Sequence, residues 1–215
     1  MSGPILVVNP NSNPAVTAGM DAALAPYHLP GAPEVHCLTL EDGPFGIESQ
    51  ADAQNAIPPL MRLVAERPDA GAIVIACYSD PGLDVCRSLT RAPVFGIQEA
   101  GVLTALARAD RFGVIAVADG SIPRHRLTLR RMGVLERLAA ERAVNLSVDQ
   151  TARADAFDRI AEVGAALTSD GAEAIVLGCA GMARHQARLA EVLGVPVVDP
   201  VRAAVAMALG TLLAR

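Results

Sequence analysis

The sequence of 215 residues contains no lysine, so all 18 of its basic residues are arginine. Without lysine the chain cannot form a Schiff base with pyridoxal phosphate, use a lysine nucleophile or build a Walker-type phosphate loop. Tryptophan is also absent, and there are only two tyrosines and four phenylalanines. The core must therefore consist mainly of Ala, Val, Leu and Ile.

Charge and hydropathy exclude several further classes. Hydrophobic residues make up 52% of the chain and charged residues 19%, which excludes intrinsic disorder. The net charge of −5 argues against a general nucleic-acid-binding protein. No apolar run approaches the roughly 18 residues of a membrane span, and the N-terminal residues show no signal-peptide pattern. We therefore expect a cytoplasmic protein that binds a small molecule, and neither nucleic acid nor membrane.

The four cysteines and four histidines show no metal-binding spacing, since the chain has neither a C-x-x-C nor an H-x-x-x-H pair. We therefore expect no metal site. In a reducing cytoplasm the thiols stay free, so a cysteine is available as an acid or base rather than as half of a disulfide.

Short apolar runs alternate with helix-like stretches along the whole chain. Strands are predicted at residues 5–8, 35–40, 72–76, 93–97, 112–117, 145–148, 174–179 and 195–199. Helices are predicted at 51–66, 81–91 and 156–167, after Ser121, and from Pro14 with Ser12 or Asn13 as its cap. The run from Ala72 is apolar throughout, as is typical of a parallel strand with both faces covered. This alternation predicts an α/β fold of parallel sheets flanked by helices.

The two halves of the chain repeat one pattern. Ala72–Cys77 aligns with Ala174–Cys179 at an offset of 102 residues (179 − 77), and Pro93 aligns with Pro196 at an offset of 103. We therefore predict an internal duplication into two pseudosymmetric domains, residues 1–97 plus 206–215 and residues 98–205. The C-terminal helix, 201–213, is expected either to pack on the first domain or to contribute to the interface of a homo-oligomer.

Cys77 and Cys179 each stand where an apolar strand ends and a helix is expected to begin. Ligands bind at this carboxyl edge of parallel strands. Ser79 or Asp80 is expected to cap the helix after Cys77, and Ala180-Gly181-Met182 leave their amides accessible. The positive end of a helix lowers the pKa of a thiol, and free amides suit an oxyanion.

Two thiols that face each other across a pseudo-twofold axis would reach one substrate from opposite sides. One thiolate would remove a proton beside a carbonyl and the other thiol would protonate the opposite face, which inverts the carbon without a cofactor. A buried cysteine is usually only a small hydrophobic residue, and this interpretation applies to Cys37 and Cys86. The equivalent positions of Cys77 and Cys179 favour catalysis for that pair.

Four segments resemble the aspartate/glutamate/hydantoin racemase superfamily, in particular its hydantoin racemase branch: Val8–Asn11, Ile75–Leu83, Gly96–Ala100 and Ile175–Met182. The likeness runs from about residue 5 to about residue 205. It implies a two-domain pseudosymmetric fold with the active site in the cleft between the domains, and cofactor-independent racemisation by two cysteines.

The resemblance also implies roles for individual residues. Cys77 and Cys179 would be the acid/base pair, and Asn9 would line the cleft. The residues that follow the two cysteines would supply substrate-facing atoms; these are Tyr78, Ser79, Ala180 and Gly181.

The same positions distinguish the branches of the superfamily. Glutamate and aspartate racemases typically have Asn-Thr and Thr after their cysteines, whereas Tyr78-Ser79 and Ala180-Gly181 suit a less charged ring. Arylmalonate decarboxylases keep only the second cysteine. We therefore favour racemisation at C5 of a hydantoin-like ring. An aspartate, glutamate or allantoin racemase, an arylmalonate-type decarboxylase and a non-catalytic binding protein are the alternatives. Ala116-Val117, where hydantoin racemases often carry Thr-Thr, leaves the natural substrate open.

Four further features have two interpretations each. Glu99 is expected either near the cleft or as a solvated carboxylate at the start of a helix. The basic run Arg124–Arg131 is interpreted as a solvated helix face rather than as an anion or partner site, and His185 is expected on the surface. The loop Gly43–Ser49 is a candidate lid, although such loops are common.

Overall fold

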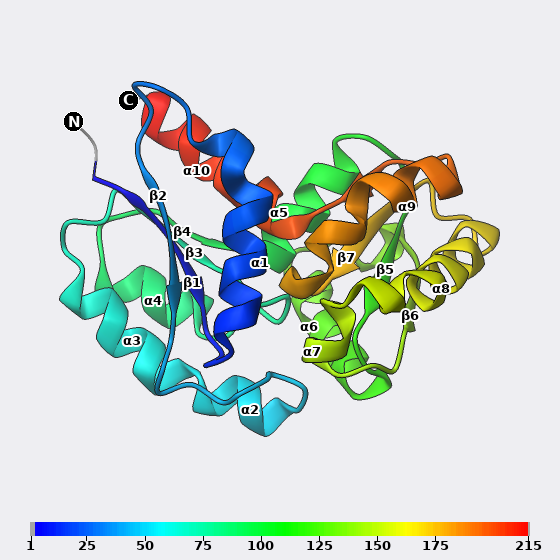
Figure 1. Cartoon of the computed structure of the whole chain (residues 1–215), viewed down its shortest axis with the longest axis horizontal. Helices are drawn as coiled ribbons and strands as arrows, with labels where there is room; N and C mark the ends of the chain where they lie inside the picture. Colours follow the sequence, from blue (N-terminus) through cyan, green and yellow to red (C-terminus); the bar gives the residue numbers. More distant parts are fainter. Residues whose placement is uncertain (1–2, 215) are drawn as a thin grey trace.

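The computed structural model describes residues 3–214, which form two lobes of similar construction (Figure 1). Each lobe contains a four-stranded parallel sheet, with strand order β2-β1-β3-β4 in the first lobe and β6-β5-β7-β8 in the second. The two strand orders are equivalent. In each sheet the first strand along the chain lies second in space, and the next two strands of the chain lie on either side of it. The predicted α/β fold with two pseudosymmetric parallel sheets is confirmed.

The first lobe is built around two fully buried strands. Its sheet consists of β1 (Ile5–Asn9), β2 (Val35–Thr39), β3 (Ala72–Ile75) and β4 (Val94–Gly96). Its helices are α1 (Pro14–Leu24), α2 (Gln50–Asn55), α3 (Ile57–Glu66) and α4 (Leu83–Leu89), with a 3₁₀ turn η1 (Ala25–Tyr27). Every residue of β1 and β3 is buried, as expected for apolar strands covered by helices on both faces.

The second lobe repeats this plan. Its sheet consists of β5 (Phe112–Ala116), β6 (Leu138–Ala143), β7 (Ala174–Gly178) and β8 (Val197–Val198). Its helices are α6 (Ile122–Arg131), α7 (Val148–Thr151), α8 (Phe157–Ser169) and α9 (Gln186–Leu193). Short 3₁₀ segments are η2 (Asp119–Ser121), η3 (Leu135–Arg137), η4 (Ala154–Ala156) and η5 (Ala180–His185). The two central strands, β5 and β7, are again buried throughout.

Two helices join the lobes. Helix α5 (Ile97–Leu106) follows the last strand of the first sheet, and α10 (Pro200–Leu213) follows the last strand of the second. They pack against each other, and α10 also contacts β1, β3 and β4. One hydrophobic cluster contains buried residues of both sheets and both helices, among them Val74, Val102 and Val176. A shared apolar core therefore fixes the two sheets relative to each other.

The strand predicted at residues 145–148 is wrong. The second sheet instead takes its edge strand from β6, whose sequence LAAERA has no β-branched residue. An edge strand has a neighbour on one side only, so its composition is less constrained than that of β5. Ser147 begins α7 through a capping box with Gln150, in which each side chain accepts the other residue's amide.

The helices after β2 and β3 differ from the sequence prediction. The predicted helix 51–66 divides at Ala56, before two consecutive prolines that lack the amide needed to continue it. The helix after β3 begins at Leu83, because Gly82 adopts a left-handed conformation with φ of 68°. Asp80 does not cap that helix; its carboxylate accepts the amides of Gln98 and Glu99 at the start of α5. Asn13 caps α1 as predicted.

No helix between residues 3 and 214 is both long and apolar enough to cross a membrane.

Candidate active site

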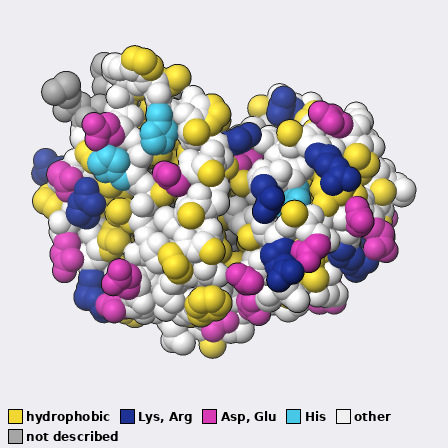
Figure 2. Space-filling model, in the orientation of Figure 1, with side chains coloured by type: hydrophobic (Ala, Val, Ile, Leu, Met, Phe, Trp, Pro, Cys, Tyr) yellow, Lys and Arg dark blue, Asp and Glu magenta, His cyan; other side chains and the backbone are white. Residues whose placement is uncertain are grey.

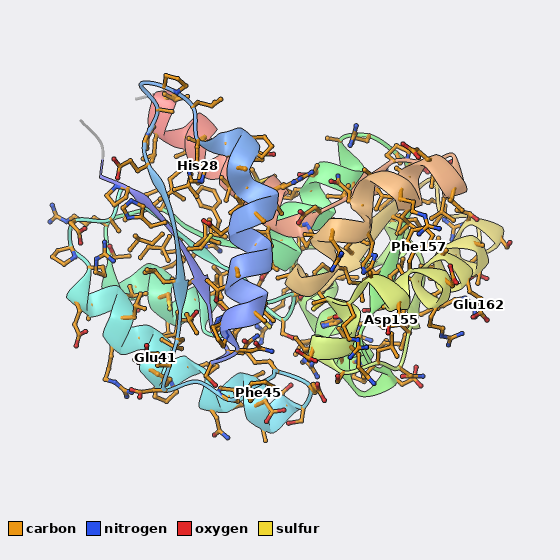
Figure 3. The ribbon with its side chains drawn as sticks, in the orientation of Figure 1. His28, Glu41, Phe45, Asp155, Phe157 and Glu162 are labelled. Carbon is orange, nitrogen blue, oxygen red and sulfur yellow. The ribbon has the colours of Figure 1, made fainter. Side chains whose placement is uncertain are left out.

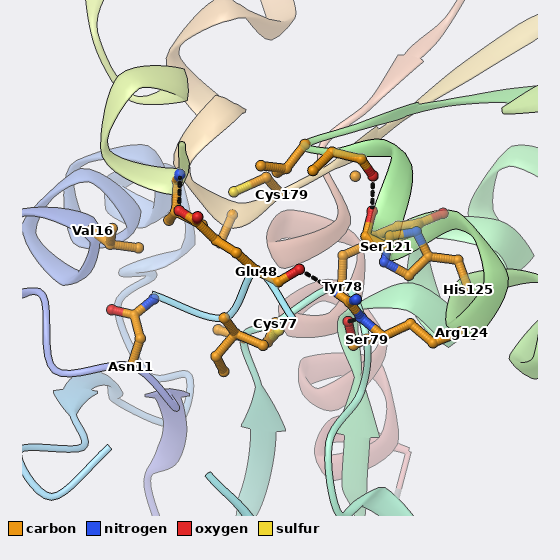
Figure 4. A pocket seen from close by; sticks show the side chains of 17 residues that line it. Asn11, Val16, Glu48, Cys77, Tyr78, Ser79, Ser121, Arg124, His125 and Cys179 are labelled. Atoms are coloured by element: carbon orange, nitrogen blue, oxygen red, sulfur yellow. Dashed lines mark hydrogen bonds between the residues drawn. The ribbon is translucent and has the colours of Figure 1, made fainter. Parts of the chain in front are cut away.

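A cavity lies between the lobes and is lined by residues of both. The space-filling view in Figure 2 shows a groove between the lobes, and Figure 4 shows the cavity from close by. Its walls are apolar at Val16, Ile47, Val117 and Val148, and polar where the sheets end. This combination is typical of sites that bind small molecules.

The structure brings Cys77 and Cys179 together in this cavity (Figure 4). Cys77 lies two residues beyond the end of β3, and Cys179 directly follows β7. The two strands are equivalent in their sheets, so the two lobes direct one thiol each toward the same space. Both thiols are free, as are Cys37 and Cys86, which do not line the cavity.

The surroundings of Cys77 hold its thiol in the protonated form. Burial raises the pKa of Cys77 to about 11, because the low-dielectric interior disfavours the thiolate. A hydrogen bond from the amide of Ser79 and the positive charge of Arg124 act in the opposite direction. The neighbouring thiol, Cys179, raises the pKa further.

Cys179 has a different set of neighbours. Burial raises its pKa, while hydrogen bonds from the amides of Gly181 and Met182 and from the hydroxyl of Thr151 lower it. The Thr151 oxygen lies 3.7 Å from the sulfur. The prediction that both thiols have lowered pKa values is therefore wrong for this structure. Desolvation outweighs the dipoles, since α4 begins well after Cys77 and Cys179 precedes only a 3₁₀ segment.

Of the predicted substrate-binding residues, Tyr78, Ser79 and Ala180 line the cavity. Gly181 does not, and lies against Thr151. Tyr78 is buried, and its ring meets that of His125 edge-on at 5.0 Å.

Asn9 is placed behind the cavity rather than in its wall. It is fully buried, and its amide nitrogen donates to Asn11 Oδ1 at 2.9 Å, to Asn13 O and to Thr17 Oγ1. Asn11 lines the cavity instead. Its Oδ1 also accepts the amide of Asn13 at 3.0 Å, so its own amide nitrogen is the end left for the cavity (Figure 4). Asn9 thus orients the residue that reaches the site.

Sequence reasoning missed Arg124 and His125, which both line the cavity. The solvated-face interpretation fits Arg126, Arg130 and Arg131, which are exposed, but not these two. Helical periodicity could have indicated that His125 faces inward, because His125 and the buried Leu129 lie four residues apart on one face of α6. The guanidinium of Arg124 donates to Ser79 Oγ at 2.8 Å and to the carbonyls of Gly120 and Glu48.

The loop Gly43–Ser49 reaches across the cavity to the second lobe. Ile47 and Glu48 line the cavity, and the Glu48 carboxylate accepts the amide of Val148 at 3.0 Å. Phe45, labelled in Figure 3, is exposed at the outer side of this loop. These contacts cover this side of the cavity, and a lid function of the loop stays a prediction.

Two further sequence predictions concern Glu99 and His185. Glu99 forms an ion pair with Arg87 at 2.7 Å and does not line the cavity. The prediction that His185 lies on the surface is wrong, because η5 turns its ring inward to within 3.1 Å of Thr151 O. Val117 and Ala118, in the loop after β5, border the cavity. Among residues 3–214, no group of three His, Cys, Asp or Glu side chains could hold a metal ion.

The fold is shared with racemases of more than one kind. The allantoin racemase of Klebsiella pneumoniae superposes with a TM-score of 0.92 at 32% identity, over 99% of this chain and 88% of that one. The glutamate racemase of Francisella tularensis superposes with a TM-score of 0.71 at 20% identity, over 99% of this chain and 82% of that one, which shows a common fold.

Sequence comparison defines the family. The Asp/Glu/hydantoin racemase model matches residues 5–208. The chain is 38% identical to the hydantoin racemase of Paenarthrobacter aurescens, over 93% of this chain and 87% of that one. It is 36% identical to the hydantoin racemase of Rhizobium meliloti, over 95% and 86% of the two chains. The chain belongs to the Asp/Glu/hydantoin racemase family and is therefore a racemase, which is an isomerase.

Proposed function

We propose that the protein is a cofactor-independent racemase that inverts C5 of a 5-monosubstituted hydantoin. The observation that carries this proposal is the cavity into which each lobe contributes one thiol, Cys77 or Cys179. Hydantoin racemases and allantoin racemase are among the relatives that share at least 30% of their residues with this chain over most of its length. Allantoin is itself a hydantoin with a ureido group at C5, so both names describe one kind of reaction centre.

In the proposed reaction one thiol removes a proton and the other donates one, and the two exchange these roles when the opposite enantiomer is the substrate. One sulfur, as thiolate, takes the C5 proton, and the electron pair of the C–H bond moves toward the neighbouring carbonyl oxygen. The thiol on the other side then donates its proton to the opposite face of C5, and the enolate electrons form the new C–H bond. The product is the other enantiomer, and the first sulfur has become a thiol.

Because the pKa values of both thiols are raised, little thiolate is present to remove a proton. This favours a substrate whose C–H proton is acidic. The C5–H of a hydantoin is more acidic than the α-proton of a free amino acid, because the ring carbonyl accepts the charge. The thiolate of Cys77 is supported first by the amide of Ser79 and then by the guanidinium of Arg124, and that of Cys179 is supported by the amides of Gly181 and Met182 and by the hydroxyl of Thr151. Arg124 also ties Ser79 in place at the cavity wall.

The test is exchange of the substrate proton in deuterated water. We expect the protein to replace the C5 hydrogen of a chiral hydantoin by deuterium and to abolish its optical rotation. The panel should include alkyl, aromatic and ureido substituents at C5, with aspartate, glutamate and an arylmalonate as representatives of the alternatives. Cys37→Ser is a suitable control variant, since Cys37 lies outside the cavity. Absence of exchange with every hydantoin would refute the proposal, and turnover of an amino acid or an arylmalonate would replace it.

We also predict that the protein is cytoplasmic and homo-oligomeric. We further predict that the chain divides into two domains, residues 1–97 plus 206–215 and residues 98–205.

A further inference from the structure

Arg124 is a partly buried cation in the wall of the cavity. Its guanidinium donates to three neutral oxygen atoms, which are Ser79 Oγ at 2.8 Å and the carbonyls of Gly120 and Glu48 at 3.3 and 3.4 Å. Among residues 3–214 no carboxylate forms an ion pair with it. A charge withdrawn from water without a counter-ion is costly. The cavity therefore contains a positive charge that the contacts of the fold do not neutralise.

The charge of Arg124 is permanent. Burial lowers the pKa of its guanidinium, while Cys77, Asp52 and Glu141 act in the opposite direction. The ordinary pKa of a guanidinium is so high that the group stays protonated in proteins. Of the residues that line the cavity, all of them in the described part of the chain, Arg124 is the one whose positive charge depends on neither pH nor tautomer.

Both lobes hold the guanidinium in place. Arg124 belongs to α6 of the second lobe, whereas Ser79 and Glu48 belong to the first, and Figure 4 shows the Arg124 side chain reaching both. Nε donates to Ser79, and each terminal nitrogen donates one of its two hydrogens to a carbonyl. The second hydrogen of each terminal nitrogen therefore remains for a molecule in the cavity.

Arg124 also lies close to one of the two thiols that have to reach C5. Its charge acts on the sulfur of Cys77, and both residues line the same cavity. In a hydantoin ring C4 is bonded directly to C5, so the oxygen on C4 is only two bonds from the carbon that the sulfur contacts. A cation that acts on this sulfur is therefore also near that oxygen.

We infer that Arg124 is a catalytic hydrogen-bond donor, whose guanidinium binds the C4 carbonyl oxygen of the substrate ring. When a thiolate takes the C5 proton, the electron pair of the C–H bond forms the C4–C5 double bond, and the π pair of the carbonyl moves onto its oxygen. The proton is then on sulfur, and the negative charge is on the oxygen beside the guanidinium. A cation fixed before the reaction stabilises this charge strongly, because it need not reorganise when the charge forms. The inference rests on the proposed function, since it names the group that stabilises the enolate of that reaction.

A role at the oxygen differs from a role at Cys77 alone. Both directions of the reaction pass through the same enolate, whereas a cation that only lowers the pKa of Cys77 matters only when Cys77 removes the proton. The test combines Arg124→Gln with Cys77→Ser, in which Cys179 is the remaining thiol. We expect Arg124→Gln to lower kcat for deuterium exchange at C5 about a hundredfold to a thousandfold in this variant as in the wild type, with KM changed much less. An unchanged rate in the Cys77→Ser protein would overturn the inference.

Two further variants complete the series. Arg124→Lys keeps the charge but loses the planar pair of donors, so its exchange rate should lie between those of the wild type and Arg124→Gln. A rate below that of Arg124→Gln would contradict a role for the charge. Arg126→Gln is the matched control, because Arg126 is an exposed arginine two residues further along α6, and its exchange rate should equal that of the wild type.

A second measurement needs no turnover. Tetramic acid is a planar five-membered lactam that is an enolate anion at neutral pH, and succinimide is a neutral imide with a ring of the same size. By isothermal titration calorimetry we expect the wild type to bind the tetramate anion at least about tenfold more tightly than succinimide. Arg124→Gln should weaken the binding of tetramate about tenfold to a hundredfold and that of succinimide little. Equal affinities of the wild type for the two compounds would overturn the inference even if the variants do not fold.

The same measurements separate this inference from the proposed function. If the wild-type protein exchanges no hydantoin, the proposed function fails. If it does and Arg124→Gln is fully active, only the role of Arg124 fails.

Discussion

The two lobes provide the same functional group in two different environments. Cys77 follows β3 and has one amide, that of Ser79, and a guanidinium, that of Arg124, to support a thiolate. Cys179 follows the equivalent strand β7 and has two amides and the hydroxyl of Thr151. A full charge acts beside one amide at Cys77, whereas several dipoles act at Cys179. The two lobes thus place their thiols at equivalent positions, while the groups that stabilise the charge of each thiolate differ.

The backbone before each thiol differs in the same way. Ala76 precedes Cys77, whereas Gly178 precedes Cys179 at the same offset of 102 residues. A Cβ on Gly178 would lie 2.4 Å from the carbonyl oxygen of Ile115 in β5. The second sheet is therefore closer packed at its carboxyl edge and cannot accept the residue that the first sheet carries.

Removal of either thiol should have the largest effect. In Cys77→Ser and Cys179→Ser we expect racemisation to fall by about 10²–10⁴-fold, since a hydroxyl is a far weaker acid and base than a thiol. Each variant should retain exchange of only the enantiomer whose proton faces the remaining thiol. Chiral chromatography and proton NMR in deuterated water measure the two reactions separately. Full racemase activity in either variant would contradict a two-thiol reaction.

A substitution of the residue before Cys179 tests the difference in packing between the two sheets. Gly178→Ala should lower the free energy of unfolding by about 1–3 kcal/mol, because the backbone of β5 must move to admit the methyl group. Gly210→Ala is a control of opposite sign, since nothing lies near its Cβ position in α10 and alanine favours a helix. Thermal and denaturant unfolding compare the two. Equal stability of Gly178→Ala and the wild type would show that the sheets are interchangeable at this edge.

Loss of the charge beside Cys77 should affect one thiol only. The cation favours the thiolate, so Arg124→Gln should raise the pKa of Cys77 above its value of about 11. At a given pH below that value, alkylation of Cys77 by iodoacetamide should then be slower, by about tenfold. Peptide mass spectrometry gives the rate for each cysteine across an alkaline pH series. The rate at Cys179 and the exposed control Arg126→Gln should be unchanged, and an equal effect on both thiols would contradict the assignment.

The smallest effect is expected at the hydroxyl beside Cys179. The Thr151 hydroxyl lies 3.7 Å from the sulfur and shares its one hydrogen with Val148 O at 2.7 Å, so Thr151→Val, at nearly constant volume, should raise the pKa of Cys179 only slightly. A weak hydrogen bond of this kind is worth about 0.5 kcal/mol, which corresponds to roughly a twofold slower alkylation. Thr168→Val is a matched control, because that hydroxyl bonds only to its own helix at Ala165 O. A slower reaction at Cys77 instead of Cys179 would contradict the expected asymmetry.

Local patterns were sufficient for the parts of the site that recur. The apolar strands ending at Ile75 and Gly178 and the cysteines beyond them could be read from the repeat of 102 residues. Strand β6 could not, because an edge strand of alanine and charged residues has no apolar alternation. Glu48 and Val148, 100 residues apart in sequence, meet only because the lobes face each other.

The sequence by itself therefore determined the two-lobed α/β plan and the placing of one thiol at the end of each equivalent strand, since neighbours along the chain encode strands and turns. The tertiary structure decided how these groups behave. Burial raises the pKa of both thiols, and contacts between distant segments place Arg124 near Cys77 and pair His125 with Glu141. Desolvation and charge pairing depend on what surrounds a group in space, and no local pattern contains that information.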